Sequence, residues 1–407
     1  MIQEISGKEK KGNIVYKVKN LELPKGMYFI GKDEKALQRM MWLGDESMKF
    51  AGHCDSIPTT KMVEGTGNDR YNYYLNKTSE LQNQFSQQIM QIRRAMGNPQ
   101  ALENIKAEFG KIDDAKVNLL AEAATEDDYW RDFVSLWCYL SFQHNQGDYK
   151  DEPHYFAGEY LARADLSSEN FDRIPVLLDM ARGYAQNLAR VGLPLNEQRD
   201  FAQAVLTRTK PGTARHKTLL FAFTNGFQAG KQETLFVEYA EQFTAAHGEA
   251  YPNIAKNIET AISKYKRLMV GSVAPGIVQP TPEGASFDLN SLRGKVVLLD
   301  FWASWCGPCR RENPNVVKVY NQYKDQGFEI LGISLDNSKD RWVKAIAQDQ
   351  LTWVHVSDLK KWSSAVARDY NVSSIPATYL LDREGKILAK NLRGAALENK
   401  LAEVFSE

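Results

Sequence analysis

Hydrophobic and polar positions follow three different patterns along the chain, and the first pattern covers residues 1–75. Short apolar or alternating runs are separated here by turn residues such as Gly44-Asp45-Glu46. Short alternating runs flanked by turn residues are typical of β-strands. The runs are Asn13–Val18, Gly26–Ile30, Met40–Leu43 and Met48–Ala51. We therefore expect a small β-rich domain at the start of the chain.

Residues 76–267 show helical spacing instead. Apolar side chains recur every three or four positions, which places them on one face of an α-helix. The clearest sets are Leu81, Phe85, Ile89, Ile92 and Met96; Trp130, Phe133, Val134, Trp137 and Leu140; and Phe171, Ile174, Leu177, Leu178 and Ala181. Glycine and proline interrupt the pattern, for example at Gly192-Leu193-Pro194. We expect an all-α domain of about eight or nine helices without a fixed repeat.

The third pattern, in residues 268–407, alternates buried apolar runs with helical stretches. The predicted strands are Lys295–Asp300, Phe328–Leu335, Trp353–Val356, Thr378–Leu381 and Lys386–Ala389. The predicted helices are 311–325, 338–348, 363–371 and 395–405. Strands alternating with helices and ending in a hairpin predict an α/β domain. The proline-containing stretch Gly271–Gly284 is expected to be the linker into it.

The candidate chemistry lies where the first of these strands ends and a helix begins, at Cys306-Gly307-Pro308-Cys309. Two cysteines in the first turn of a helix are within disulfide reach, and the free N–H groups and helix dipole there favour a thiolate. We expect Cys306 to be the accessible nucleophile of low pKa and Cys309 the more buried thiol that resolves a mixed disulfide. Gly307 permits close backbone approach, and Pro308 suits a helix start.

A zinc site or a structural disulfide is the alternative for this pair. A C-x-x-C zinc half-site needs two further ligands. The other cysteines, Cys54 and Cys138, are isolated, and no histidine pair follows. Cys54 next to His53 is expected to be an ordinary thiol at a strand end, and Cys138 a core thiol inside an apolar helix. The polar stretch His144–His154 is expected to be a solvated loop, so the sequence predicts no metal site.

Several motifs make residues of about 271–407 resemble the TlpA/ResA-like branch of the thioredoxin superfamily. The resemblance rests on Ala274-Pro275, Leu292–Lys295, Asp300–Cys309, Arg310 with Glu312 and Pro314, Ser373–Thr378 and Asp382–Lys386. Members of this branch are bacterial, extracytoplasmic thiol–disulfide oxidoreductases. Residues 1–75 also resemble, weakly, a small β-domain that often precedes TlpA-like domains.

The resemblance implies the roles of further residues. Pro376 is expected to form a cis peptide bond beside the cysteines, and Ile375 to offer backbone groups to an extended substrate. Trp305, Gly307 and Pro308 belong to the same expected substrate-binding surface. We expect no cofactor besides the redox-active disulfide Cys306–Cys309. The expected partners are a disulfide-containing protein and an external thiol donor, for which a membrane reductase is one candidate.

Two acids are candidate acceptors for the Cys309 proton. Asp300 is the thioredoxin-like choice, whereas Glu312 matches an acid of the ResA-like branch. Asp300 lies between Leu299 and Phe301, so burial should raise its pKa and suit it to accept a proton. We expect Asp300 to be the main acceptor and the more solvated Glu312 to tune both cysteines electrostatically.

Two other functions are weighed against disulfide reduction. Peroxidases of the AhpC/TSA type place proline and threonine at fixed positions before their reactive cysteine, but Leu299 and Ala303 stand there in this chain. A partner-binding protein that uses the thioredoxin fold as a scaffold would not need both Cys306 and Cys309. The Gly-Pro dipeptide between the cysteines resembles reducing members of the superfamily, which favours reduction over oxidation.

Composition narrows the function classes. The chain has 407 residues with 51 basic and 51 acidic side chains, so it lacks the positive excess expected of a nucleic-acid binder. Four cysteines are too few for a disulfide-rich scaffold. No apolar run approaches the ~20 residues of a membrane span. Met1-Ile2-Gln3-Glu4 does not resemble a signal peptide. Given the resemblance, we expect a periplasmic or membrane-anchored protein whose signal peptide is already removed; a cytoplasmic location is the alternative.

Overall fold

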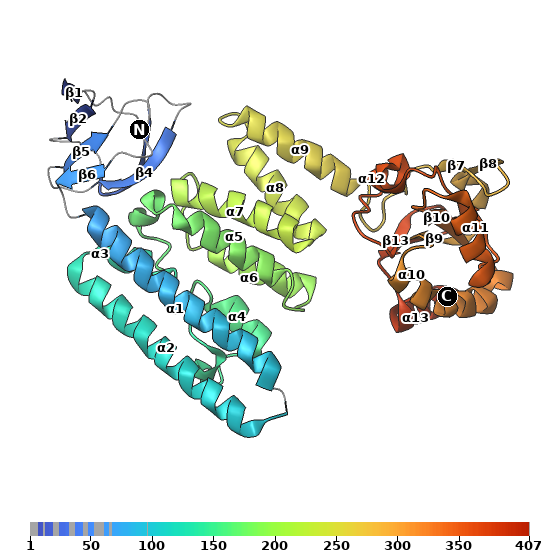
Figure 1. Cartoon of the computed structure of the whole chain (residues 1–407), viewed down its shortest axis with the longest axis horizontal. Helices are drawn as coiled ribbons and strands as arrows, with labels where there is room; N and C mark the ends of the chain where they lie inside the picture. The colour runs from blue at the N-terminus through green and yellow to red at the C-terminus, as the bar shows by residue number, and fades with distance from the viewer. Residues whose placement is uncertain are drawn as a thin grey trace. The chain divides into compact units, whose positions relative to one another are not determined.

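The computed structural model describes residues 7–10, 13–18, 24–31, 37–43, 48–52, 61–64, 67–95 and 97–406. The chain divides into two compact units, Met1–Ala255 and Lys256–Glu407. Strands come first, helices follow in the middle, and a mixed sheet with helices closes the chain (Figure 1). The predicted multidomain fold class is therefore confirmed.

The first unit begins with antiparallel strands. β1 (Gly7–Lys10), β2 (Asn13–Val18), β5 (Met48–Gly52) and β6 (Lys61–Glu64) form one sheet in this order, and β3 (Gly26–Gly31) pairs with β4 (Leu37–Leu43). The four expected strands are all present. Helix begins at Gly67, earlier than the expected residue 76. The expected division into domains 1–75, 76–267 and 268–407 stays a prediction.

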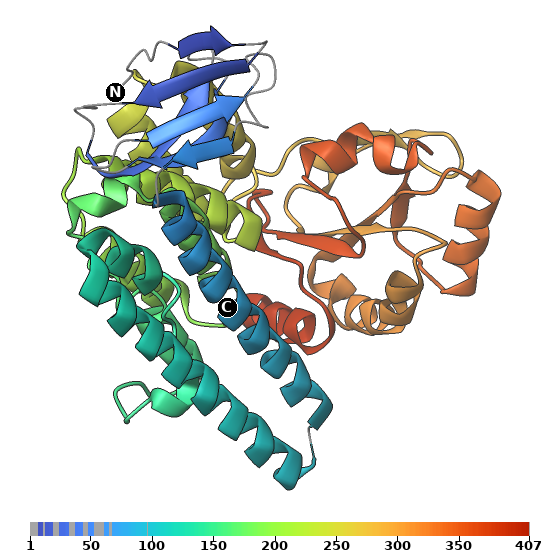
Figure 2. The ribbon, with the colours of Figure 1, turned by 60° about the vertical axis from the view of Figure 1, so that its left-hand side comes forward.

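Helices make up the rest of the first unit. They are α1 (Gly67–Ala95), α2 (Pro99–Glu126), α3 (Asp128–Ser135), α4 (Glu152–Glu159), α5 (Val176–Leu188), α6 (Leu195–Leu206), α7 (Ala214–Gly230), α8 (Glu233–His247) and α9 (Pro252–Lys266), of which α9 contains the boundary between the units. The long helices α1 and α2 lie side by side (Figure 2). No helix in the described part of the chain is long and apolar enough to cross a bilayer.

Close packing of α5 against α7 depends on two glycines. A Cβ atom on Gly226 would lie 2.5 Å from the Arg182 carbonyl oxygen, and one on Gly230 would lie 2.5 Å from the Ala189 Cβ. Both distances are far below van der Waals contact, so the missing side chains let the two helices approach each other.

Cys138 is a buried core thiol, as expected, but it does not lie inside a helix. Helix α3 ends at Ser135, and the chain then turns toward α2. There the backbone N–H of Ser141 donates to the buried carboxylate of Asp113 at 3.1 Å, and the Ser141 hydroxyl donates to it at 2.6 Å. These hydrogen bonds offset the cost of burying Asp113. His53 and Cys54 lie outside the described residues.

The second unit is built on a five-stranded sheet. Its order is β11 (Val354–Val356), β10 (Phe328–Ser334), β9 (Val296–Trp302), β12 (Ala377–Leu381) and β13 (Ile387–Lys390). β9, β10 and β11 are parallel, whereas β12 is antiparallel to both of its neighbours. Its α-helices are α10 (Gly307–Tyr323), α11 (Lys339–Gln348), α12 (Ala365–Asp369) and α13 (Gly394–Ser406). Each strand and helix expected after residue 295 is present.

Alternation along β9 decides which face each side chain occupies. All seven residues of β9 are buried, and successive side chains point to opposite faces of the sheet. Leu298 and Trp302 join the core with α10, α11 and α13, whereas Leu299 and Phe301 join the core with α12 on the other face. Asp300 has the same parity as Leu298 and Trp302, so its carboxyl group lies in the apolar layer beneath α10.

The expected linker at Gly271–Gly284 is instead part of the second unit. Ala274 and Ile277 are buried against the sheet, and Leu268 before them is also buried there. β7 (Val278–Pro280) and β8 (Ser286–Asp288) form a small hairpin. Prolines and glycines do mark turns in this stretch, but the apolar residues between them add to the core. The prediction of a linker was therefore wrong.

Candidate functional site

Helix α10 begins at the cysteine pair. Cys306 is its N-cap and forms a disulfide with Cys309, with the two Cα atoms 5.3 Å apart. The Cys309 backbone N–H donates to Cys306 Sγ at 3.1 Å. When the disulfide is reduced, this N–H and the helix dipole will favour the thiolate of Cys306. The structure thus places the expected nucleophile where its charge is stabilised.

Exposure separates the two cysteines less than expected. In the disulfide, Cys306 is 4% exposed and Cys309 is 2% exposed. Each sulfur is covered partly by its bonded partner, so the oxidised pair does not show Cys306 as an accessible thiol. Trp305 and Gly307, which flank Cys306, are exposed, and so is Pro308, which precedes Cys309. These three residues therefore form the exposed surface beside the pair.

Two buried or partly buried carboxylates hold the loop and helix around the cysteines. Asp336 accepts hydrogen bonds from the Ser304 backbone N–H at 2.8 Å and from its hydroxyl at 2.5 Å. Asp349 accepts from Arg310 in a two-pronged ion pair and from Asn313 at 2.6 Å. Sequence reasoning missed both acids, because they lie far along the chain and belong to no motif.

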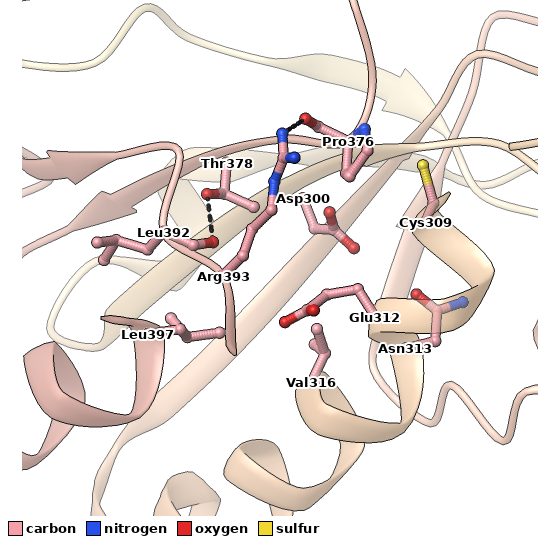
Figure 3. A pocket seen from close by; sticks show the side chains of 10 residues that line it. All are labelled: Asp300, Cys309, Glu312, Asn313, Val316, Pro376, Thr378, Leu392, Arg393 and Leu397. Atoms are coloured by element: carbon pink, nitrogen blue, oxygen red, sulfur yellow. Dashed lines mark hydrogen bonds between the residues drawn. The ribbon is translucent and has the colours of Figure 1, made fainter. Parts of the chain in front are cut away.

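A small pocket beside Cys309 brings both candidate acids together (Figure 3). Asp300 from β9 points into it, Cys309 and Glu312 from α10 line one side, and Pro376 and Arg393 also contribute. Its accessible volume is about 10 Å³, which is the room that one water molecule requires. The pocket therefore has room for one water molecule beside Cys309 and Asp300.

Burial raises the pKa of Asp300 from 3.8 to about 7. This pKa includes a smaller raising effect of the neighbouring Glu312 carboxylate and a lowering effect of the Arg393 guanidinium. A carboxyl group with a pKa near neutrality exchanges protons readily at physiological pH. The expectation that desolvation raises the pKa of Asp300 agrees with this geometry.

Glu312 is half-buried and held in place. Its Oε1 accepts a hydrogen bond from the Gly394 backbone N–H at 2.7 Å and one from Asn315 Nδ2 at 3.0 Å. The side chain therefore faces the pocket in a fixed orientation and is not an ordinary surface group. Its carboxylate raises the pKa of Asp300, whereas its expected influence on the two cysteines stays a prediction.

The chain reverses direction toward β12 through a cis peptide bond between Ile375 and Pro376, as expected for Pro376. The Arg393 guanidinium donates a hydrogen bond to the Pro376 carbonyl. Ile375 is partly buried, and within the described residues its backbone N–H and C=O make no hydrogen bond. These two groups are available for pairing with an extended peptide.

Arg393 is a further residue of this site that sequence reasoning missed. It lies in a polar stretch before the last helix, and no motif distinguishes that stretch from a surface loop. Only the fold brings it to Asp300 and Pro376, because β13 returns the chain to β12 and residue 391 bonds the Thr378 carbonyl at 2.8 Å. Within the described residues, no group of three or more His, Cys, Asp or Glu side chains could hold a metal ion.

Known proteins that are similar to this chain match it over the segment that contains the cysteine pair. A family model described as the AhpC/TSA family matches residues 270–390, a range that includes both cysteines. The thiol-disulfide oxidoreductase ResA of Geobacillus kaustophilus is 38% identical over 120 residues, which are 30% of this chain and 67% of that protein. ResA of Bacillus subtilis is 33% identical over 136 residues, which are 33% of this chain and 74% of that protein.

Among solved structures, the thioredoxin domain of a thiol-disulfide oxidoreductase from Bacteroides vulgatus is 42% identical, with a TM-score of 0.33. The match covers 34% of this chain and 99% of that domain. The ResA relatives carry the family assignment, and they confirm the resemblance inferred from the sequence motifs. The chain belongs to the ResA-like thiol–disulfide oxidoreductases of the thioredoxin superfamily.

Proposed function

We propose that this thiol–disulfide oxidoreductase reduces disulfide bonds of other proteins outside the cytoplasm. The observation that carries the proposal is a helix-capping cysteine pair next to a buried carboxyl group whose pKa is about 7. The pair supplies an attacking and a resolving sulfur, and the carboxyl group is suited to take the proton that the second sulfur must lose.

The reaction starts from the reduced pair. The Cys306 thiolate attacks one sulfur of the substrate disulfide, and the other substrate sulfur leaves as a thiolate. Cys309 then loses its proton and attacks Cys306 Sγ. The second substrate sulfur leaves, and the Cys306–Cys309 disulfide forms. Two electrons have passed to the substrate, so an external thiol donor must reduce the pair before the next cycle.

Asp300 is the main acceptor for the Cys309 proton in this proposal. Both residues line the small pocket, and the pKa of Asp300 matches a proton transfer near neutral pH. Glu312 raises that pKa and fixes the other side of the pocket. The release rate of the mixed disulfide in Asp300→Asn distinguishes the two acids.

The substrate lies across the exposed side of the pair. Trp305, Gly307 and Pro308 provide surface next to Cys306, and the free backbone groups of Ile375, which precedes Pro376, pair with an extended segment of the substrate. Such pairing through the backbone accepts many sequences, so specificity must come from side chains nearby.

The location and the electron donor follow from the family resemblance. TlpA/ResA-like proteins work outside the cytoplasm, so we place this chain in the periplasm, either free or anchored to the membrane. The donor is then a thiol protein, with a membrane reductase as the candidate, and no cofactor besides the Cys306–Cys309 disulfide is involved. Residues 1–267 are assigned no chemical role and remain candidates for partner binding.

Peroxidase activity is the second candidate, because the matching family model is named for AhpC/TSA proteins. Leu299 and Ala303 are fully buried apolar residues at the positions where those peroxidases carry proline and threonine. Neither side chain can activate or orient a peroxide oxygen. We expect reduced protein to react with hydrogen peroxide no faster than an ordinary thiolate.

The reduction potential of the Cys306–Cys309 couple tests the proposal. The full chain is equilibrated in dithiothreitol and glutathione buffers of defined potential, and the oxidised fraction is measured. A reductase should lie near −270 mV, whereas a value near about −120 mV would identify an oxidant and overturn the proposed direction. Rapid oxidation by hydrogen peroxide would favour the peroxidase instead.

A further inference from the structure

Two exposed tryptophans meet next to the redox pair. Trp305 and Trp362 are each 45% exposed, and their ring centroids lie 6.2 Å apart with the planes at 62°. The contact covers only part of each ring, so both indoles still offer apolar surface to a ligand. Trp305 directly precedes Cys306, whereas Trp362 comes from a separate loop, between β11 and α12.

Sheet topology explains why these two loops meet. β9, β10 and β11 are parallel, so the segments that follow β9 and β11 leave the sheet at the same edge. The first of these segments carries Trp305 and the cysteines. The second carries Trp362, within a short 3₁₀ turn at Lys361–Ser363.

The loop that carries Trp362 is ordered by its own hydrogen bonds. The Ser357 hydroxyl donates to the Ser334 carbonyl at 2.8 Å and accepts from the Leu359 N–H at 3.1 Å. The Ser363 N–H donates to the Lys360 carbonyl at 2.9 Å. Leu359 and Lys361 have φ values of +55° and +50°, a region that costs a non-glycine residue energy. A strained, bonded loop of this kind holds an exposed indole in a fixed place.

Positive charge accompanies the indole. Lys360 and Lys361 are exposed, and their ammonium groups form no ion pair within the part of the chain that the structure describes. The nearby Asp358 carboxylate accepts a hydrogen bond from the Lys360 backbone N–H at 3.0 Å and offsets part of their charge. A ligand that covers the tryptophans would bring its flanking residues close to these two ammonium groups. Acidic residues would be favoured there and basic residues disfavoured.

We infer that Trp362, together with Trp305, Lys360 and Lys361, selects protein substrates whose cysteine is flanked by a large apolar side chain and by acidic residues. This inference rests on the proposed function, and it adds the substrate class. The backbone of Ile375 pairs with any extended segment, whereas the two indoles bind the apolar side chain and the lysines bind the acidic one. The loop after β11 is thus a specificity determinant separate from the cysteine motif.

The test uses the pre-reduced full chain and measures second-order rates by stopped flow. One peptide carries phenylalanine beside a cysteine in a mixed disulfide with thionitrobenzoate, followed by two glutamates. A second peptide has lysines for the glutamates, and a third has glycine for the phenylalanine. The small molecule 2-hydroxyethyl disulfide, which has no side chains to recognise, serves as the reference substrate.

Trp362→Ala should lower the rate with the acidic phenylalanine peptide about tenfold more than it lowers the rate with the small disulfide. Trp362→Phe should keep most of the parent's rate with that peptide. The variant with both Lys360→Glu and Lys361→Glu should prefer the basic peptide, and the salt dependence of its rate with the acidic peptide should change sign. The matched control Lys324→Glu, an exposed lysine that precedes β10 at the opposite edge, should behave like the parent.

The outcomes separate this inference from the proposed function. If the parent reduces the small disulfide but shows no preference among the peptides, or if Trp362→Ala slows all substrates equally, the inference is wrong. If the parent fails to reduce even the small disulfide, the proposed function itself fails.

Discussion

Replacing Asp300 with asparagine should stabilise the protein and slow its chemistry at the same time. An unfolded chain ionises this carboxyl group above about pH 4, whereas the folded chain holds the proton until about pH 7. Between these values the folded state binds one more proton than the unfolded state, so stability falls as pH rises. Asparagine has nearly the same shape and no charge, so it avoids this loss.

The size of the effect follows from the two pKa values. The interval from 3.8 to about 7, at about 1.4 kcal/mol for each pH unit, corresponds to about 4 kcal/mol. Asp300→Asn should therefore differ little from the parent in unfolding free energy near pH 4 and exceed it by about 4 kcal/mol near pH 8. Glu312→Gln removes the nearby negative charge, lowers the pKa of Asp300 and should shrink the difference.

Calorimetry of the oxidised full chain between about pH 4 and pH 8 measures the difference in unfolding free energy between Asp300→Asn and the parent. The relevant unfolding transition is the one that Asp300→Asn shifts. A gap that stays constant with pH would mean that Asp300 ionises equally in the folded and unfolded chain, and the reasoning would fail. In the same variant, stopped-flow measurement at neutral pH should show release of the mixed disulfide slowed on the order of 100-fold, as loss of a general base does. An unchanged release rate would remove Asp300 from the mechanism and leave Glu312 or water as the acceptor.

Three further predictions follow from the geometry. Limiting iodoacetamide should label Cys306 first in the reduced protein, and Cys309→Ser but not Cys306→Ser should accumulate mixed disulfides with clients; preferential labelling of Cys309 would reverse the assignment. Burial lowers the pKa of His355 from 6.5 to about 4. Between these pH values the unfolded chain binds one more proton than the folded chain, so the free energy of unfolding falls as pH drops from about 6.5 to about 4. His355→Phe should remove up to about 3 kcal/mol of that loss, measured by denaturant unfolding near pH 4 and pH 7, and an unchanged pH dependence would contradict it. A 268–407 fragment should still reduce insulin; an inactive fragment with a native circular dichroism spectrum would show that earlier residues complete the site.

The sequence predicted best those features that depend on residues close together in the chain. The unbroken apolar run before the cysteines predicted β9, and the spacing of Cys306 and Cys309 predicted both the helix start and the disulfide. The cis bond at Pro376 was expected from its motif. These features depend on residues that are neighbours in the chain, so the sequence alone specifies them.

Features that depend on distant neighbours could not be predicted in the same way. Ile89 and Ile92 have helical spacing with Phe85, yet they are 45% and 37% exposed, because periodicity identifies a face but not whether another element covers it. His355 lies over Gly332, where a Cβ atom would be 2.3 Å from its Nδ1. Only the pairing of β10 with β11 brings these two residues together. Arg393 reaches the site through the same kind of long-range pairing.

The late position of Arg393 and Gly394 in the chain has a consequence for biosynthesis. A ribosome makes Cys306 and Cys309 long before it makes the residues that hold Glu312 and Pro376 in place. Leu397 and Leu401, which belong to the core beneath α10, come later still. The nascent chain therefore carries both thiols before the pocket around Asp300 is enclosed. A chain cut short before residue 391 would keep its nucleophile and lose the surroundings that make it a catalyst.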